Sequence, residues 1–264
     1  MSILPKRTTR LLAALGFSLA CAGVARAAPL ASLDLSGPFA TRSTWRFTTS
    51  QGPDIPDPAG EEGKVAGVVG LCLSKDGGAT CDPATGKALL SPDGPDMFDE
   101  PHMLKTVRIV HPSADRPLLL LQIGSLRSGD GGQRIATQLF AYDRRADTFH
   151  EVYRWVTGHN NNQEVRYVDT GSLAGAVIAA EPTDDAPFGF WITIDRLAPT
   201  GRYAQVLRYR SATRYGDGNP LAVIDSEMPS IERRLGLWHA GQRLPAPAGA
   251  CPQPHLLRGE LWCR

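Results

Sequence analysis

The chain has 264 residues, with 28 Lys and Arg against 27 Asp and Glu, and its formal net charge is +1. Its first 27 residues have the pattern of a cleaved leader; they hold four basic residues and no acidic one, so the remainder has 24 basic side chains against 27 acidic ones. Nucleic-acid binding needs a concentrated basic face, and this mildly acidic remainder argues against nucleic acid as a partner.

Residues 1–27 are predicted to be a signal peptide. A basic start is followed by an apolar run over residues 11–25 that is too short to span a membrane comfortably. Small residues at Ala25 and Ala27 then suit signal peptidase, so we expect a mature chain that begins at residue 28 and enters the periplasm or the exterior. A lipoprotein anchored at Cys21 is the alternative, although the Leu of "SLAC" lies one place too late. No later apolar segment approaches the length of a transmembrane helix.

Four cysteines remain after the leader, and an even number in an exported chain indicates disulfide bonds. Four cysteines allow three pairings. We expect Cys72 to pair with Cys81 and Cys251 with Cys263, because each pair brackets a short, turn-rich segment that closes at little cost. Each bridge would contribute about 3 kcal/mol in the chain-entropy model. Zinc binding is disfavoured because no two cysteines have C-x-x-C spacing.

Short apolar or alternating runs, broken by Gly, Pro, Asn and Asp, dominate the rest of the chain and are typical of strands and turns. In one of them Phe188, Phe190, Ile192 and Ile194 alternate on one face. The predicted strands cover residues 44–49, 65–73, 105–111, 117–126, 133–143, 148–157, 163–169, 174–181, 188–195, 202–211 and 221–227.

The connections between residues 105 and 211 are short, which favours antiparallel meanders. We therefore predict an all-β, mainly antiparallel fold over residues 28–264, one domain with a sandwich or propeller-like arrangement of meander sheets. No repeat of fixed period is present, and this counts against the propeller. One short helix is predicted over residues 229–236, with Pro229 at its start.

The segment "GHNNNQEVRY", residues 158–167, lies between two predicted strands. Asn accepts the left-handed conformation, so the segment is suited to a turn. A turn needs one or two such residues, and this segment has more polar residues than that. The alternative is that His159, Asn161 and Asn162 bind a polar ligand, since amides offer donors and acceptors together.

A second candidate region is rich in arginine. Arg208, Arg210 and Arg214 would share one face of a strand. They are either paired with acidic side chains of neighbouring strands or available to an anionic ligand group.

Three carboxylates are the candidate catalytic residues. Asp225 and Glu227 would lie on one face of the strand predicted over residues 221–227, and Glu164 follows the asparagine run. Paired carboxylates can serve as acid and base in glycosidic cleavage, but their separation does not follow from the sequence.

A third candidate is the acidic loop that contains Asp93, Asp96 and Asp99, which could bind calcium. Its spacing fits no EF-hand, and a solvated acidic loop is the simpler interpretation. The chain has no G-x-S-x-G, G-x-x-x-x-G-K or H-E-x-x-H motif, and no two histidines lie within four residues of each other. No metal and no cofactor is predicted.

These features predict an exported, disulfide-bonded β protein that binds an envelope component, a glycan or another polar ligand. A periplasmic or secreted hydrolase of glycans or esters, acting through Glu164, Asp225, Glu227 and the arginines, is the alternative. The sequence favours binding over catalysis and does not identify the ligand or the oligomeric state.

Overall fold

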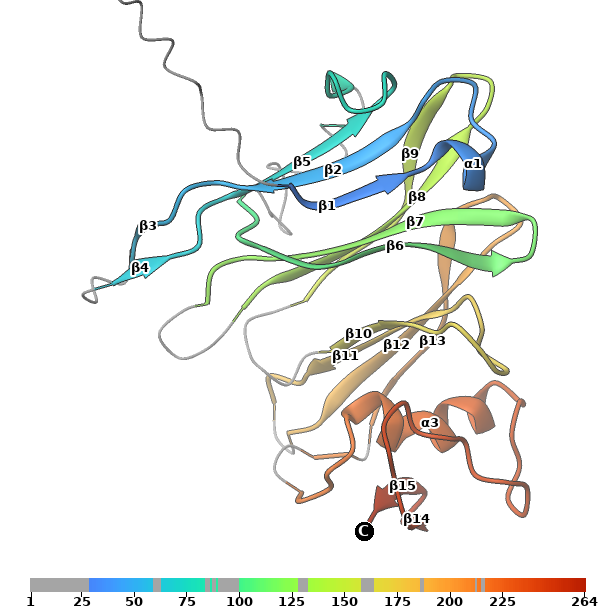
Figure 1. Cartoon of the computed structure of the whole chain (residues 1–264). Coiled ribbons are helices and arrows are strands. Elements are labelled where there is room, and N and C mark those ends of the chain that lie inside the picture. Colours follow the sequence, from blue (N-terminus) through green and yellow to red (C-terminus); the bar gives the residue numbers. More distant parts are fainter. Residues whose placement is uncertain are drawn as a thin grey trace, which may run out of the picture.

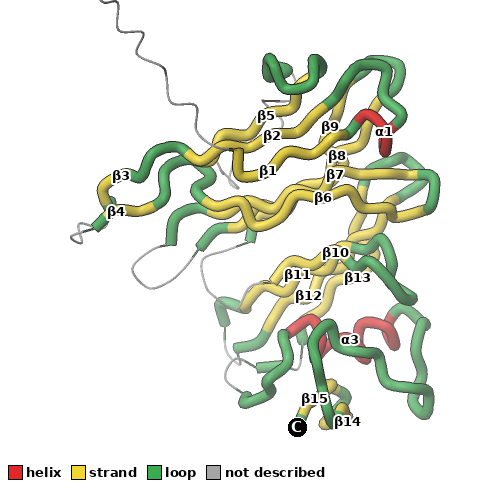
Figure 2. Tube along the Cα trace, in the orientation of Figure 1, coloured by secondary structure: helices red, strands yellow, loops and turns green. Residues whose placement is uncertain are grey.

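A computed structural model describes residues 29–58, 63–83, 86, 89, 100–127, 133–157, 164–185, 188–211, 213–214 and 217–264. The predicted signal peptide, residues 1–27, lies outside the described residues, and so does the alternative lipid anchor at Cys21. Figures 1 and 2 show that strands make up most of the described chain, as predicted for an all-β fold.

Antiparallel pairing forms three larger sheets, two of which are four-stranded meanders. The first sheet has the order β1 (Pro29–Asp34), β2 (Arg46–Gln51), β5 (Val69–Ser74). The first meander contains β6 (Met103–Ser113), β7 (Arg116–Gly124), β8 (Ile135–Asp143) and β9 (Thr148–Val156). The second meander contains β10 (Glu164–Tyr167), β11 (Val177–Pro182), β12 (Phe190–Leu197) and β13 (Tyr203–Arg210).

Smaller elements complete the described fold. Two short hairpins pair β3 (Ile55–Pro56) with β4 (Lys64–Val65) and β14 (Pro254–Leu257) with β15 (Glu260–Cys263). The helices are α1 (Ser36–Phe39) and α3 (Val223–Arg234).

The sheets stack in layers: the first sheet covers one face of the first meander, the second meander covers the other, and α3 covers the far face of the second meander (Figure 1). Strand β7 shows the consequence. Leu119 and Leu121 belong to the core shared with the first sheet, whereas Leu118 and Leu120 belong to the core shared with the second meander. Since successive side chains on a strand point to opposite faces, a strand buried on both faces has a continuous apolar sequence.

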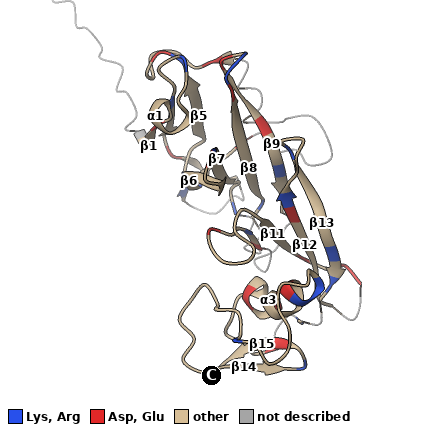
Figure 3. Ribbon diagram, turned by 90° about the vertical axis from the view of Figure 1, so that its right-hand side faces the viewer, with Lys and Arg blue, Asp and Glu red and all other residues tan. Residues whose placement is uncertain are grey.

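The edge strand β9 carries one acidic and one basic residue (Figure 3). Glu151 and Arg154 form an ion pair there at 2.7 Å, and Glu151 also accepts a 2.7 Å hydrogen bond from Gln138. Polar contacts also join the two meanders, since the indole N–H of Trp155 donates to Glu181 at 3.1 Å. The interface between the two meanders is therefore partly polar.

The prediction of a strand over residues 221–227 is wrong, because residues 223–227 form the start of α3. Ile224 and Ile231 are one heptad apart, and both pack on the second meander. Pro229 lies inside the helix rather than at its start, and there it removes a backbone hydrogen bond. Burial of one helix face offsets that loss. The alternation of polar and apolar residues in this segment favoured a strand and gave no sign of the helix.

Two further differences concern strands. Phe188 does not continue the alternating face of β12, because the strand begins at Phe190 and the Phe188 side chain is 61% exposed. Strands β1, β3, β14 and β15 were not predicted, and the one strand predicted over residues 65–73 is divided between β4 and β5. Short strands that pair at the edges of the fold lack the long alternating runs by which the other strands are recognised.

Both predicted disulfides are present, Cys72 with Cys81 and Cys251 with Cys263. The second one joins β15 to the segment that precedes β14 and so closes the C-terminal hairpin. Among the residues that the structure describes, no helix is both long and apolar enough to cross a bilayer.

Candidate functional site

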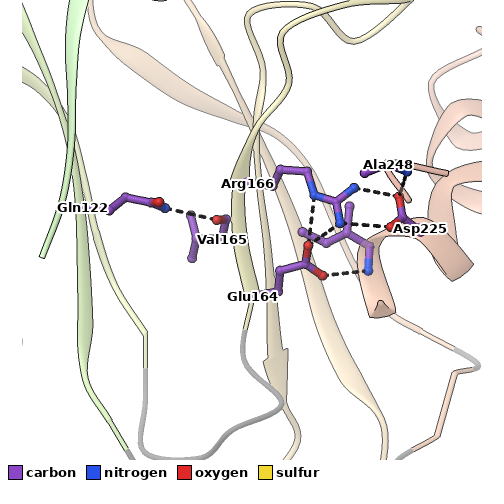
Figure 4. Close-up of polar contacts among 7 residues, drawn as sticks. Gln122, Glu164, Val165, Arg166, Asp225 and Ala248 are labelled. Carbon is purple, nitrogen blue, oxygen red and sulfur yellow. Dashed lines mark hydrogen bonds and ion pairs between the residues drawn. The ribbon is translucent and has the colours of Figure 1, made fainter. Parts of the chain in front are cut away.

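Arg166 lies at the centre of an ion-pair network that joins the second meander to α3 (Figure 4). Its Nη1 and Nη2 donate to the two carboxylate oxygens of Asp225 at 2.6 and 3.1 Å. Its Nε donates to Oε1 of Glu164 at 2.9 Å, and Nη2 contacts the same oxygen. Two carboxylates therefore share one guanidinium group, whose planar fork of donors suits such bidentate contacts.

The alternation of β10 places these side chains. Val165 and Tyr167 pack in the core between the two meanders, so Glu164 and Arg166 point to the opposite face, toward α3. On the side of the first meander, Gln122 donates to the backbone carbonyl of Val165 at 3.2 Å (Figure 4). Strand β10 is thus held by both neighbouring layers.

The network also satisfies the start of α3. Its N-cap residue, Ala222, has no side chain that could cap the helix, and Glu164 Oε2 instead accepts a hydrogen bond from the N–H of Ile224 at 3.2 Å. Asp225 lies in the first helical turn, where the helix dipole favours a negative charge. Its Oδ1 also accepts the N–H of Ala248 at 3.0 Å. The carboxylates therefore cap the helix and hold the C-terminal segment against it.

Burial raises the pKa of the Glu164 carboxyl above its ordinary value. The positive charge of Arg166 and the hydrogen bond from Ile224 oppose the rise, and the nearby negative charge of Asp225 adds to it. A carboxyl with a raised pKa can hold a proton at milder pH, as a general acid must. Both oxygens of Glu164 already accept hydrogen bonds from the protein, which is the arrangement of a structural group.

A cleft of about 470 Å³ opens beside the network and is named here the α3 cleft. Three segments line it: residues 166–173, which run from the end of β10 into the loop that follows, the α3 helix, and residues 245–248. Arg166 and Asp225 are part of this lining. The network therefore forms one wall of the α3 cleft and fixes the positions of all three segments.

Two of the three carboxylates that line the α3 cleft form ion pairs with arginines. Asp169 accepts two hydrogen bonds from Arg108, at 2.6 and 3.0 Å. Ser172 donates to the Glu232 carboxylate, and its carbonyl accepts a 2.8 Å hydrogen bond from Arg196. The cleft thus offers hydroxyl, carboxylate and backbone groups, and carboxylates outnumber arginines in its lining.

Glu227 does not join this network. Tyr209 donates to it at 2.8 Å, and the hydroxyl and N–H of Thr213 donate at 2.6 and 3.2 Å, while its side chain is 1% exposed. Residues two apart on a helix do not share a face, so Asp225 and Glu227 do not form the pair expected from a strand. Tertiary packing instead brings Asp225 and Glu164 together around Arg166.

Arg208 and Arg210 share the outer face of β13, as predicted, whereas Arg214 lies beyond the end of the strand. Arg208 stacks on the ring of Trp191 at 4.7 Å, and Arg210 forms a 3.2 Å ion pair with Asp185. Arg214 lines a different cavity of about 340 Å³ at the C-terminal hairpin, together with Asp217, Leu257, Arg258, Glu260 and Trp262. The arginines do not converge with Glu164 and Asp225.

Two predicted sites fall outside the described residues. They are the ligand site at His159, Asn161 and Asn162 and the calcium candidate at Asp93, Asp96 and Asp99. Within the described ranges, no three His, Cys, Asp or Glu side chains are grouped so that they could hold a metal ion.

Sequence reasoning missed Arg166, Ser172, Glu232 and Ala248. One signal was present, because Glu164 and Arg166 are opposite charges two places apart on a predicted strand and therefore share a face. The contacts with α3 and residues 245–248 had no local signal, since these segments are distant in the sequence.

The fold and the site together define an all-β protein of stacked meanders, with a cleft of mixed polar and apolar lining beside a helix held by ion pairs. Comparison with known protein families, curated proteins and solved structures finds no match to this chain.

Proposed function

We propose that this chain is an exported binding protein that holds a polar, uncharged ligand, such as a segment of a glycan, in the α3 cleft. The observation that carries the proposal is the cleft itself, about 470 Å³ with hydroxyl and carboxylate side chains set among apolar ones in its lining. Ligand sites of proteins typically enclose roughly 300–1,000 Å³. The excess of carboxylates in the lining disfavours an anionic ligand, and the hydroxyl groups beside them suit a polar ligand without negative charge.

The lining suits hydroxyl groups. Thr170, Ser172 and Glu232 contribute two hydroxyls and a carboxylate. Sugar hydroxyls both donate and accept, so they match hydroxyls and carboxylates equally well. Arg166 stabilises this wall of the cleft without needing a charged ligand, since Glu164 and Asp225 already balance it.

Export is part of the proposal, and the two disulfides support it because such bonds persist in oxidising compartments. The periplasm or the exterior is the proposed location, reached by cleavage after Ala27. Mass spectrometry of the exported protein tests this directly. A chain that begins at Ala28 is expected, an acylated chain that begins at Cys21 would establish the lipoprotein alternative, and an intact residue 1 would contradict both.

Binding is tested with the purified chain from residue 28 onward and neutral oligosaccharides, first on an array and then by calorimetry. Glu232→Gln is expected to weaken binding by about tenfold, the effect of losing one charge-assisted hydrogen bond. The matched control is Glu100→Gln, which removes the same charge from an exposed residue outside the cleft. An array without any bound neutral glycan, or equal effects of the two substitutions, would reject the proposal.

A hydrolase remains the second candidate, because burial raises the pKa of Glu164 and a second carboxylate, Asp225, lies in the same network. Under this alternative a chromogenic glycoside or ester would be turned over, and Glu164→Gln would abolish turnover while binding persisted. The binding proposal expects no turnover by either form.

A further inference from the structure

A second cavity, of about 310 Å³, lies where the turns of three layers meet, and it is named here the tip cavity. The lining comes from α1, the β6–β7 turn, the β8–β9 hairpin and the β12–β13 connection. These parts of the chain lie on the same side of the molecule in Figure 1. The tip cavity shares no lining residue with the α3 cleft.

The inner surface of the tip cavity is apolar. Phe39 and Leu118 line it and are 6% and 3% exposed, and Leu197 adds a third large apolar side chain. Phe39 is held in place by an edge-to-face contact with Phe149, with ring centroids 5.0 Å apart. A rigid apolar surface of this kind favours an apolar part of a ligand.

The rim of the tip cavity is basic. Arg116 and Arg144 are exposed, and neither forms an ion pair with any residue in the described part of the chain. Arg144 donates through Nη2 to the carbonyl of Ala40 at 3.1 Å, which orients its guanidinium group. His150 adds a further nitrogen to the rim. Among the lining residues Asp115 is the one acid, and it accepts a 2.8 Å hydrogen bond from Ser113.

We propose that the tip cavity binds a small amphipathic anion, a molecule with an apolar body and one carboxylate head. The body would lie on Phe39, Leu118 and Leu197, and the head would accept hydrogen bonds from Arg116 and Arg144. Guanidinium groups form short, charge-assisted and often bidentate hydrogen bonds with carboxylates. The chemistry differs from that of the α3 cleft, where the arginine is already balanced by two carboxylates, so the two sites select different ligands.

Three probes separate the two parts of this recognition. Octanoate has both the apolar chain and the carboxylate, 1-octanol has the chain without the charge, and inorganic phosphate has charge without the chain. Calorimetry on the chain from residue 28 onward is expected to show saturable octanoate binding, with 1-octanol and phosphate each weaker by about tenfold or more, the effect of losing one half of the contacts. Equal affinity for octanoate and 1-octanol would overturn the proposal, and so would the absence of saturable octanoate binding.

Substitutions then locate the site. The double variant Arg116→Ala/Arg144→Ala is expected to weaken octanoate binding by about tenfold or more. Asp115→Asn removes the acid from the lining and is expected to strengthen it by about twofold to threefold. A gain of affinity cannot result from misfolding, so this variant keeps the test decisive if the double variant is unstable. The matched control, Arg243→Ala, removes an exposed arginine that does not line the cavity. If Arg243→Ala weakens binding as much as the double variant, or if Asp115→Asn weakens it, the proposal is wrong.

Discussion

Arg166 and Asp225, 59 residues apart in the sequence, form a two-point ion pair that fastens the first turn of α3 to the edge strand of the second meander. The Asp225 side chain is only 6% exposed, and that of Arg166 is 23% exposed. Apolar packing of Ile224 and Ile231 holds the helix against the sheet, and the ion pair fixes the position of its first turn. Because Arg166 and Asp225 both line the α3 cleft, this contact also shapes the cleft.

Replacement of Arg166 by Leu should destabilise the protein strongly, because it leaves the carboxylate of Asp225 buried without its partner. We expect the free energy of unfolding to fall by about 3–5 kcal/mol, measured by urea denaturation. Arg210→Leu is the matched control, since it breaks an ion pair with the exposed Asp185 and should cost less than about 1 kcal/mol. Similar losses in the two variants would show that the Arg166 network contributes no more than a surface pair.

Glu164 should make stability fall as pH rises. Its folded-state pKa is raised above the ordinary value of 4.5, so the folded protein binds the proton more tightly than the unfolded chain does. The stabilising effect of protonation is therefore complete below about pH 4.5 and is lost as pH rises to the raised pKa. Glu164→Gln cannot titrate, and the unfolding free energy of the variant relative to wild type should increase across this window. A relative decrease with rising pH would contradict the assignment. Asp195 and Glu260 also have raised pKa values, and the comparison at each pH cancels their contribution.

The disulfide between Cys251 and Cys263 should hold the C-terminal hairpin in place. Replacement of both residues by Ser is expected to cost about 3 kcal/mol and to increase hydrogen exchange of the backbone amides in β14 and β15. The disulfide between Cys72 and Cys81 closes a loop of similar length, so replacing both of these cysteines by Ser should cost a similar amount. Exchange in the C-terminal hairpin should remain slow in that second variant, and fast exchange there in both would indicate global rather than local loosening.

Two glycines in the connection between β10 and β11 provide a matched pair. Gly175 and Gly171 both have positive φ, +80° and +82°, but a Cβ on Gly175 would lie 2.8 Å from Pro112 Cα, whereas that on Gly171 would meet open space. Substitution of each by Ala should cost about 1 kcal/mol for the backbone conformation. Gly175→Ala should cost at least about 1 kcal/mol more because the backbone of β6 must move. Thermal denaturation measures both, and equal losses would mean that this turn does not press on β6.

The amino-acid sequence by itself determined the all-β class and most strands between residues 105 and 211, and it favoured the two disulfide pairings that the structure shows. These features depend on local pattern: alternation along a strand, glycine-rich turns and short loops between cysteines. It also placed Asp225 and Glu164 among the candidate residues, although for a role as catalytic acid and base rather than as partners of Arg166.

Tertiary structure alone decided the conformation of residues 223–234 and the membership of the site. The segment around Pro229 has a weak local preference, and burial of Ile224 and Ile231 on the second meander makes it helical. The helix then turns Asp225 toward Arg166 and Glu227 toward Tyr209, an arrangement that no spacing along the chain could specify. Each of these contacts joins segments far apart in the sequence, and only the packing of one layer against the next brings such segments together.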